Sequence, residues 1–433
     1  MRILMLGINY WPEETGIAVF NTGRCEYLAA QGHEVTMVTG FPYYPRWRVA
    51  PEYRGRLFAR ERRNGVDIRR SYLYVPRRVT TLRRIVHEAS FIAVSTARAF
   101  AGRRPDLLVT VSPPLGLAVS SVLLRRRWGI PYVFHVPDLQ PDAAVDLGML
   151  PSGRAVRLLY AVERMAYRHA ALVSTLTRAM ERRIVAKGVS PARVTLFPDW
   201  ADPVLFALPM TGGGAAARGQ LGLGERFVVL HAGNMGVKQG LDVVLDAAAR
   251  TRNREDIVYL LVGDGAARPG LEARAAAARL PNLRFLPLQP DAIFRDLLAA
   301  ADLTLVTQQA VVADIVFPSK VLTLLAAAKP VVASLNVSSE VARVVMEAKA
   351  GLVTPAEDGG ALAEAVRVLR EDPVRRRRMA EAGRAYARAH WDRAQTLADM
   401  EQVLREVVAA HRSPAYLGAT APDRSSVGDS RAR

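Results

Sequence analysis

The stretch FVVLHAGNMGVKQGLDVVLDAAARTRNREDIVYLLVGDG, residues 227–265, carries the clearest signal of the fold. Two apolar runs, FVVLHAG and IVYLLVGDG, each end in a glycine-containing loop, and a longer segment separates them. Short apolar strands separated by helices of this length are typical of parallel βαβ units. The alternation continues through LRFLPL, LTLVTQ, PVVASL and AGLVTP, so the sequence predicts a complete doubly wound α/β domain in this half of the chain.

The N-terminal half shows the same alternation. We predict a strand at Ile3–Ile8, a helix at Ile17–Ala30 and a second strand at Glu34–Thr39. Further strand-like runs are LLVTVS from Leu107, YVFHV from Tyr132, ALVSTL from Ala171 and VTLF from Val194. The predicted fold class is therefore α/β, with two facing Rossmann-like doubly wound domains.

The boundaries follow from breaks in this pattern. We expect an N-terminal domain at 1–203, a Gly- and Pro-rich linker at 204–224 and a C-terminal domain at 225–390. A helix at 391–412 is expected to return to the first domain, and the polar tail at 413–433 to be disordered. The GGGAAA of the linker satisfies the G-x-G-x-x-A dinucleotide fingerprint, but no strand leads directly into it, so we give it no weight.

Composition limits the partners and the compartment. The 433 residues include 59 Lys and Arg against 41 Asp and Glu, a net charge of +18, which favours nucleic acid, phosphorylated small molecules or acidic membrane lipids. The single cysteine, Cys25, excludes an internal disulfide and fits a reducing cytoplasm. No window of about 20 residues is free of charge, so we expect no membrane-spanning helix.

Candidate functional residues follow the predicted strands, because two facing doubly wound domains bind ligands between the carboxyl ends of their sheets. Gly16 begins a helix, where free backbone N–H groups attract anions, although it can also simply serve the turn. Lys238 follows the first strand of the second domain, within reach of a phosphate on the turn. Asp264 lies between two glycines in VGDG, where it can contact a ligand or cap the next turn.

A second anion-binding helix start is predicted at Pro318, Ser319 and Lys320, since proline favours the first helical turn and exposed N–H donors lie beside the lysine. The alternative is that Lys320 is a solvated surface charge. Together with Lys238 and Gly16, this segment indicates a nucleotide diphosphate compound bound between the domains.

The cluster FHVPDLQPD places His135 and Asp138 at the end of a first-domain strand, facing the same crevice. The chain contains no Asp-x-Asp motif and no cysteine near His135, so we expect no metal site. Positioning or proton chemistry on a sugar hydroxyl is the better use of these two side chains. The alternative is a histidine that only caps a strand end.

These motifs together resemble the retaining glycosyltransferases of family 4, which have the GT-B fold. The resemblance covers Met1 to about His411, and it is carried by these stretches: Thr15–Gly16, QGHEVTMVTG, FHVPDLQPDAAVDLGML, VTLFPDWAD, HAGNMGVKQGL, VGDG, FLPLQP and PSKVLTLLAAAKPVVAS. Within the family, GINYWPEETGI, GFPYYPRW and AGNMGVKQGL are most similar to the colanic-acid-type branch that builds exopolysaccharide repeat units.

The resemblance implies roles for single residues. His135 lies beside the transferred sugar, with Asp138 as a second catalytic candidate, and Asn234 replaces an arginine that many relatives have. The paired glutamates E-x7-E of the family are absent, because the equivalent positions are Ile315, or Asp314 with a shift of one residue, and Thr323. The implied donor-binding set is Gly16, Asn234, Lys238, Gly263, Asp264, Gly265, Pro318, Ser319, Lys320 and Thr323.

The resemblance also implies the substrates. It predicts a metal-independent retaining transfer from a GDP- or UDP-sugar, with GDP-fucose one candidate, to a polyprenyl-diphosphate-linked sugar. The donor phosphate accepts the acceptor's proton, so lysines and helix N-termini matter more than a base. Arginines and aromatic residues crowd the segment from Arg46 to Arg104, which favours a cytoplasmic protein held peripherally on the inner face of the cytoplasmic membrane. The alternative for this segment is a merely solvated basic surface.

Two alternative functions are also compatible with some of these sequence features. A nucleotide-sugar 2-epimerase resembles GT-B enzymes but acts on a soluble substrate and does not need the basic aromatic segment. A basic nucleic-acid-binding protein would explain the charge alone. The sequence shows no helix-turn-helix, zinc finger or RNA-binding motif, so we expect no nucleic-acid partner.

Overall fold

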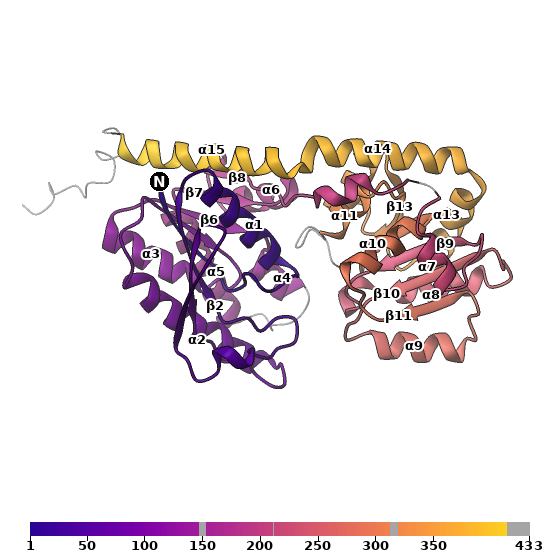
Figure 1. Ribbon diagram of the computed structural model, residues 1–433, viewed down its shortest axis with the longest axis horizontal. Coiled ribbons are helices and arrows are strands. Elements are labelled where there is room, and N and C mark those ends of the chain that lie inside the picture. The colour runs from indigo at the N-terminus through magenta and orange to yellow at the C-terminus, as the bar shows by residue number, and fades with distance from the viewer. Residues whose placement is uncertain (147–152, 211, 312–318, 414–433) are drawn as a thin grey trace, which may run out of the picture.

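The computed structural model describes residues 1–146, 153–210, 212–311 and 319–413. Two α/β domains lie side by side, and helices α14 (Pro373–Trp391) and α15 (Arg393–Arg412) run along one side of both, as Figure 1 shows. The prediction of two Rossmann-like doubly wound domains is confirmed.

The first domain is built on a sheet whose order is β3-β4-β2-β1-β5-β6-β7-β8 among the described residues. Its strands are β1 (Arg2–Leu6), β2 (Glu34–Gly40), β3 (Phe58–Arg63), β4 (Val66–Ser71), β5 (Leu107–Val111), β6 (Tyr132–Val136), β7 (Leu172–Thr175) and β8 (Val194–Leu196). Its helices are α1 (Ile17–Ala30), α2 (Thr81–Phe100), α3 (Leu117–Trp128), α4 (Gln140–Asp146), α5 (Arg154–His169) and α6 (Arg178–Ala186). Cys25 is a buried core residue of α1.

The antiparallel hairpin β3–β4 at the sheet edge was not predicted. Both residues of its turn have positive φ, 45° at Asn64 and 81° at Gly65. An Asn-Gly pair is the strongest short-range hairpin signal, so this element could have been found from the sequence. Its edge strand β3 reads FARERR, and its alternating charged residues hide it from a search for apolar runs.

The second sheet has the order β11-β10-β9-β12-β13-β14. Its strands are β9 (Phe227–Ala232), β10 (Ile257–Val262), β11 (Leu283–Leu286), β12 (Leu303–Thr307), β13 (Val331–Leu335) and β14 (Gly351–Pro355), each from one of the six predicted runs. Its helices are α7 (Ala215–Gln220), α8 (Asp242–Arg250), α9 (Arg268–Ala277), α10 (Asp291–Ala300), α11 (Lys320–Ala326), α12 (Glu340–Glu347) and α13 (Gly359–Glu371).

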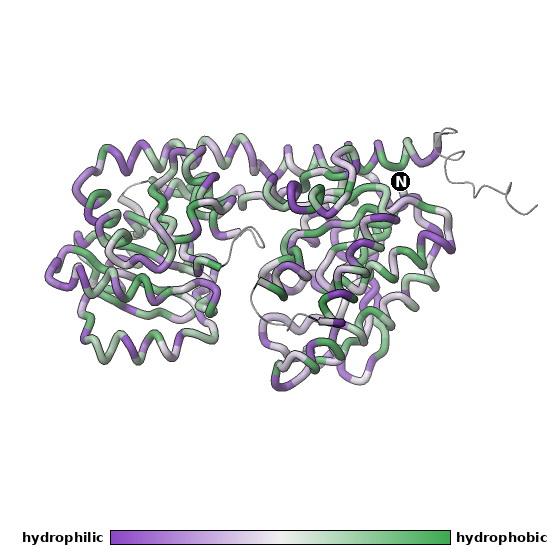
Figure 2. The backbone as a smooth tube through the Cα atoms, turned by 180° about the vertical axis from the view of Figure 1, so that it is seen from behind, coloured by the Kyte–Doolittle hydropathy of each residue, from purple (hydrophilic) through white to green (hydrophobic). Residues whose placement is uncertain are grey.

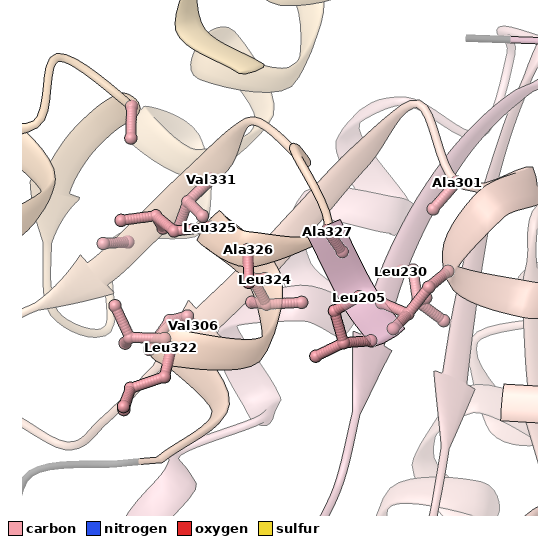
Figure 3. Close-up of a cluster of buried hydrophobic side chains, with 14 of the residues drawn as sticks. Leu205, Leu230, Ala301, Val306, Leu322, Leu324, Leu325, Ala326, Ala327 and Val331 are labelled. Carbon is pink, nitrogen blue, oxygen red and sulfur yellow. The ribbon is translucent and has the colours of Figure 1, made fainter. Parts of the chain in front are cut away.

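The segment expected as a linker packs against the second domain. Leu205, Ala217 and Leu223 are buried in the same cluster as Leu230 of β9, and Figure 3 shows Leu205 beside Leu230. Gly214 has a φ of 72° and precedes α7, where any Cβ would collide with Ala300. The glycines of GGGAAA therefore let α7 approach α10 closely. In the sequence the same glycines look like a flexible linker, so the short helix α7 is not apparent.

The C-terminal helices connect the two domains. Asp392 separates α14 from α15. Its side chain caps α15 by accepting a hydrogen bond from Gln395 N at 3.0 Å. The apolar residues Leu397, Leu404 and Val408 of α15 pack into the core of the first domain. Figure 2 shows hydrophilic and hydrophobic residues alternating along both helices, as expected of helices that lie on a surface.

Candidate functional site

The two sheets direct charged residues toward one another. Asp138 follows β6 of the first domain, and Lys238 follows β9 of the second. The ammonium of Lys238 lies close enough to lower the pKa of the Asp138 carboxyl, although burial is the larger effect and the pKa is raised on balance. The loops at the carboxyl ends of these strands therefore face each other across the interdomain cleft.

Two glycine turns interlock on the second-domain side. Gly233 N donates to Val262 O at 2.9 Å, and Met235 N donates to Asp264 O at 2.8 Å. A Cβ on Gly263, whose φ is 143°, would collide with the carbonyl oxygen of Gly233. A Cβ on Gly265 would lie 2.5 Å from the Met235 carbonyl. Only glycine lets these turns touch, so they form one compact backbone surface at the sheet edge.

Lys320 places a buried cation beside this surface. A Cβ built on Gly233 would lie 3.5 Å from Lys320 Nζ. That nitrogen has no hydrogen-bond partner within the described part of the chain, and burial lowers the lysine pKa to about 8. Beneath it lies His231, whose pKa burial holds well below its usual value, with the Lys320 charge lowering it further. A buried, unpartnered ammonium beside a glycine turn is prepared for an anion.

Three other predicted donor-site residues lie on the same loops. Lys238 is exposed on a short 3-10 turn, and its carbonyl oxygen accepts a hydrogen bond from Gln309 N at 2.9 Å. Asn234 is exposed beside Gly265. Asp264 Oδ1 accepts a hydrogen bond from Gly265 N at 2.7 Å, as a turn-capping aspartate does.

The remaining donor-site predictions fall at α11 and α1. Ser319 precedes α11, where its carbonyl accepts a hydrogen bond from Leu322 N at 3.1 Å, and half-buried Thr323 lies one turn further. Pro318 and the family positions Asp314 and Ile315 lie outside the described residues. Gly16 is exposed at the start of α1 with a φ of 61° and no side-chain cap, so the first N–H groups of α1 are free for a ligand.

His135 lies near the carboxyl end of β6 and is buried. It lies within β6, between β5 and β7, and its side chain is 1% exposed. Its Nδ1 is 3.0 Å from Ser174 Oγ, while Nε2 has no partner among the described residues. Burial holds the pKa of the ring well below its usual value, and the Arg24 charge lowers it further. The imidazole is therefore neutral at pH 7, and its buried Nε2 keeps an unused capacity for one hydrogen bond.

The ion pair of Arg24 and Asp199 was not predicted from the sequence. Arg24 Nη2 is 2.8 Å from Asp199 Oδ1, and both side chains are largely buried. The pKa of Asp199 is raised to about 6, mainly by burial and in small part by the neighbouring Asp138, while Arg24 opposes both effects. The two residues are 175 positions apart, so no local pattern could have joined them.

The described residues contain neither a cluster of metal ligands nor a candidate membrane-spanning helix. In that part of the chain no group of three or more His, Cys, Asp or Glu side chains could hold a metal ion. No helix there is long and apolar enough to cross a membrane.

Comparison with known proteins identifies the class. Residues 15–200 match the family model described as glycosyl transferase 4-like domain, and residues 215–386 match glycosyl transferases group 1. The chain is thus a glycosyltransferase of the GT-B fold, and it belongs to the family that combines these two domains.

The chain is similar to two named bacterial glycosyltransferases. The chain is 38% identical over 332 residues to the "Putative colanic acid biosynthesis glycosyl transferase WcaI" of Escherichia coli K12, covering 75% of this chain and 81% of the relative. It is 29% identical over 273 residues to the "Probable glycosyltransferase WbjE" of Pseudomonas aeruginosa, covering 63% and 67% of the two chains.

Solved structures support the fold alone. The sucrose-phosphate synthase of Thermosynechococcus elongatus superposes with a TM-score of 0.73 at 20% identity, covering 94% of this chain and 99% of that one. Anabaena HepE in complex with UDP superposes with a TM-score of 0.69 at 18% identity, covering 94% and 100%.

Proposed function

We propose that this glycosyltransferase moves a sugar from a nucleotide-diphosphate sugar, with retention of configuration, to a polyprenyl-diphosphate-linked glycan in exopolysaccharide biosynthesis. The observation that carries the proposal is the Lys320 ammonium, buried without a partner beside the interlocked turns at Gly233 and Gly263. A donor diphosphate placed there would lie between Lys320 and Lys238, near the start of α1 in the first domain. The name of the colanic acid relative supports the biosynthetic setting.

The chemistry follows from these charges. The bond between the sugar C1 and the diphosphate oxygen breaks, a bond from C1 to the acceptor hydroxyl oxygen forms on the same face, and the hydroxyl proton passes to the departing phosphate. Negative charge grows on the leaving nucleotide, so Lys238 and Lys320 stabilise the transition state more than the ground state. No carboxylate nucleophile is needed, and we expect the reaction to proceed without a metal ion.

His135 and Asp138 position the reacting groups in this proposal. The neutral imidazole of His135 can share a hydrogen bond through Nε2 with a hydroxyl group of the transferred sugar. Asp138 lies across the cleft from Lys238, where its half-buried carboxyl can orient the acceptor. We expect both to affect turnover more than nucleotide affinity.

The donor is a GDP- or UDP-sugar in this proposal, with GDP-fucose one candidate. Among the fold relatives, HepE was solved with UDP. Because the E-x7-E glutamates are absent, the ribose must be held by other groups, and the Thr323 hydroxyl is available for it. The backbone turns at Gly263 and Gly265 suit the flat edge of a base.

A basic apolar surface supports peripheral binding at the inner face of the cytoplasmic membrane. The first turns of α2 expose apolar side chains, most of all Leu82 at 71%. Anionic headgroups attract arginine, while the acyl boundary accepts apolar side chains, so such a mixed surface suits a membrane interface. The exposed residues are Arg77, Arg78, Val79, Leu82, Arg83, Arg84, Ile85 and Val86.

A melting-temperature screen tests the donor assignment. The full-length protein is heated with GDP, UDP, ADP and their common sugar conjugates, without added metal. A ligand that binds only the folded state must raise the melting temperature. We expect a selective rise with one nucleotide and its sugar conjugate, unchanged by EDTA. No rise with any nucleotide at millimolar concentration would contradict the proposal.

A further inference from the structure

A wide groove opens on the first domain at the carboxyl ends of β2 and β4. It has a volume of about 800 Å³ and is lined from residues 41–55 and 72–77. We call it the distal groove, because β2 and α2 lie on the side of the domain away from α14 and α15 (Figure 1). β2 pairs in parallel with both β1 and β4, so the groove lies at the same sheet edge as the loop that follows β1 and contains Gly16.

The distal groove concentrates unpaired positive charge. Arg46, Arg48, Arg54 and Arg77 line it, and all four are exposed. None forms an ion pair with a carboxylate in the described ranges, in contrast to buried Arg70, whose Nε is 2.7 Å from Glu61 Oε1. Four arginines around one hollow repel each other unless an anion lies between them, and guanidinium groups match phosphate oxygens in geometry.

Aromatic side chains share the lining with these arginines. Trp47, Tyr53, Tyr72 and Tyr74 contribute to the groove. Aromatic rings in a concave site offer flat apolar faces with a polar tip, which suits the alternating faces of a sugar ring. Trp47 has a φ of 50°, a conformation that bulky residues rarely adopt and that is found at functional sites.

Buried polar groups hold the walls of the groove. Glu13 Oε1 accepts hydrogen bonds from Tyr43 N and Tyr44 N, both at 2.8 Å, and the carboxyl is buried. The opposite wall is held by His87, whose Nδ1 lies 2.6 Å from Tyr74 O. Burying such groups is costly unless they are bonded, so the groove is a preformed site.

Arg84 lies near both the wall of the distal groove and the interdomain cleft. The charge of Arg84, on the first turns of α2, lowers the pKa of Asp138 at the cleft and of Tyr43 in the groove wall, although burial raises both on balance. A long ligand can therefore lie with one end beside the exposed apolar turns of α2, its anionic part in the groove and its far end near Asp138.

We infer that the distal groove binds the diphosphate and the adjoining sugar of a lipid-linked acceptor, with the lipid directed toward α2. The inference rests on the proposed function for the nature of the acceptor, but the groove itself can be tested without transfer. Its occupant is a prenyl diphosphate, and free pyrophosphate or an anionic bilayer are the competing sources of the same phosphate chemistry.

The test measures binding of farnesyl diphosphate to the full-length protein by calorimetry. The groove variant is Arg48→Gln with Arg54→Gln. The matched control is Arg126→Gln with Arg157→Gln, two exposed arginines of α3 and α5 that have no ion pair in the described structure and change the net charge equally. We expect the groove variant to lose affinity at least tenfold and the control to change less than twofold.

Several results would overturn the inference. They are equal losses in both variants, no loss in the groove variant, or no binding of farnesyl diphosphate to the natural chain at millimolar concentration. Inorganic pyrophosphate binding as tightly as farnesyl diphosphate would assign the groove to a free anion. Full competition by phosphatidylglycerol vesicles would assign it to general membrane binding. The nucleotide-induced rise in melting temperature, measured on the same samples, reports the donor site separately, so its loss marks failure of the proposed function instead.

Discussion

Replacing Lys320 by methionine should stabilise the ligand-free protein while removing donor affinity. Burial lowers the pKa of this lysine from 10.5 to about 8, and no partner among the described residues offsets the cost. At about 1.36 kcal/mol per pH unit, the charged side chain costs about 3 kcal/mol in the folded state at pH 7. Methionine fills a similar volume without charge, so we expect a gain of about 1–3 kcal/mol in the free energy of unfolding.

The stability cost of the Lys320 charge should change with pH in a defined direction. The folded-state pKa is below the unfolded value, so the unfolded chain binds the extra proton between pH 8 and 10.5. The stability cost of Lys320 is therefore full below pH 8 and disappears as pH rises to 10.5. The difference in melting temperature between Lys320→Met and the natural chain should shrink over that range.

Lys329 is the matched control. Burial also lowers its pKa to about 8, but its Nζ donates to Ala299 O at 3.0 Å and Ala301 O at 3.1 Å. Lys329→Met leaves these carbonyls unpaired, so it should destabilise the protein without changing nucleotide affinity. Lys320→Met should weaken nucleotide binding at least tenfold. A Lys320→Met protein that is less stable than the natural chain, and still binds nucleotide normally, would refute the reasoning.

Four further substitutions test the site and its surroundings. Lys238→Ala should lower the transfer rate tenfold or more, about 1.4 kcal/mol, with an unchanged melting temperature; near-normal activity would contradict its diphosphate contact. His135→Ala should abolish transfer with nucleotide affinity largely unchanged, and a parallel fall in both would make His135 a structural residue. Gly263→Ala should lower the melting temperature and prevent nucleotide binding, because its Cβ would collide with Gly233. Gly270→Ala, in α9 with open space around the added Cβ, should instead stabilise the protein by up to about 1 kcal/mol.

The strands of the second domain and the two-domain fold could be predicted from the sequence. Each strand from β9 to β14 is an apolar run of four to six residues, a local signal that needs no knowledge of neighbours. Gly263 and Lys320 could be singled out for the same reason, since they follow or begin such elements. The hairpin β3–β4 was missed although Asn64 and Gly65 mark its turn, because the edge strand β3 is rich in charged residues and neither strand contains a long apolar run.

The two sheets and the loops at their carboxyl ends follow from local patterns in the chain. The burial, the pKa and the pairing of the side chains there depend instead on tertiary packing. Ser174 and Phe197 bury His135 from distant strands and loops, and Asp199 reaches Arg24 across 175 positions. Local periodicity reports the neighbours along one helix or strand, whereas burial, pKa and pairing depend on every element packed around a group. The distal groove is of this second kind, since its walls come from two segments, 41–55 and 72–77, held by Glu13 on one side and His87 on the other.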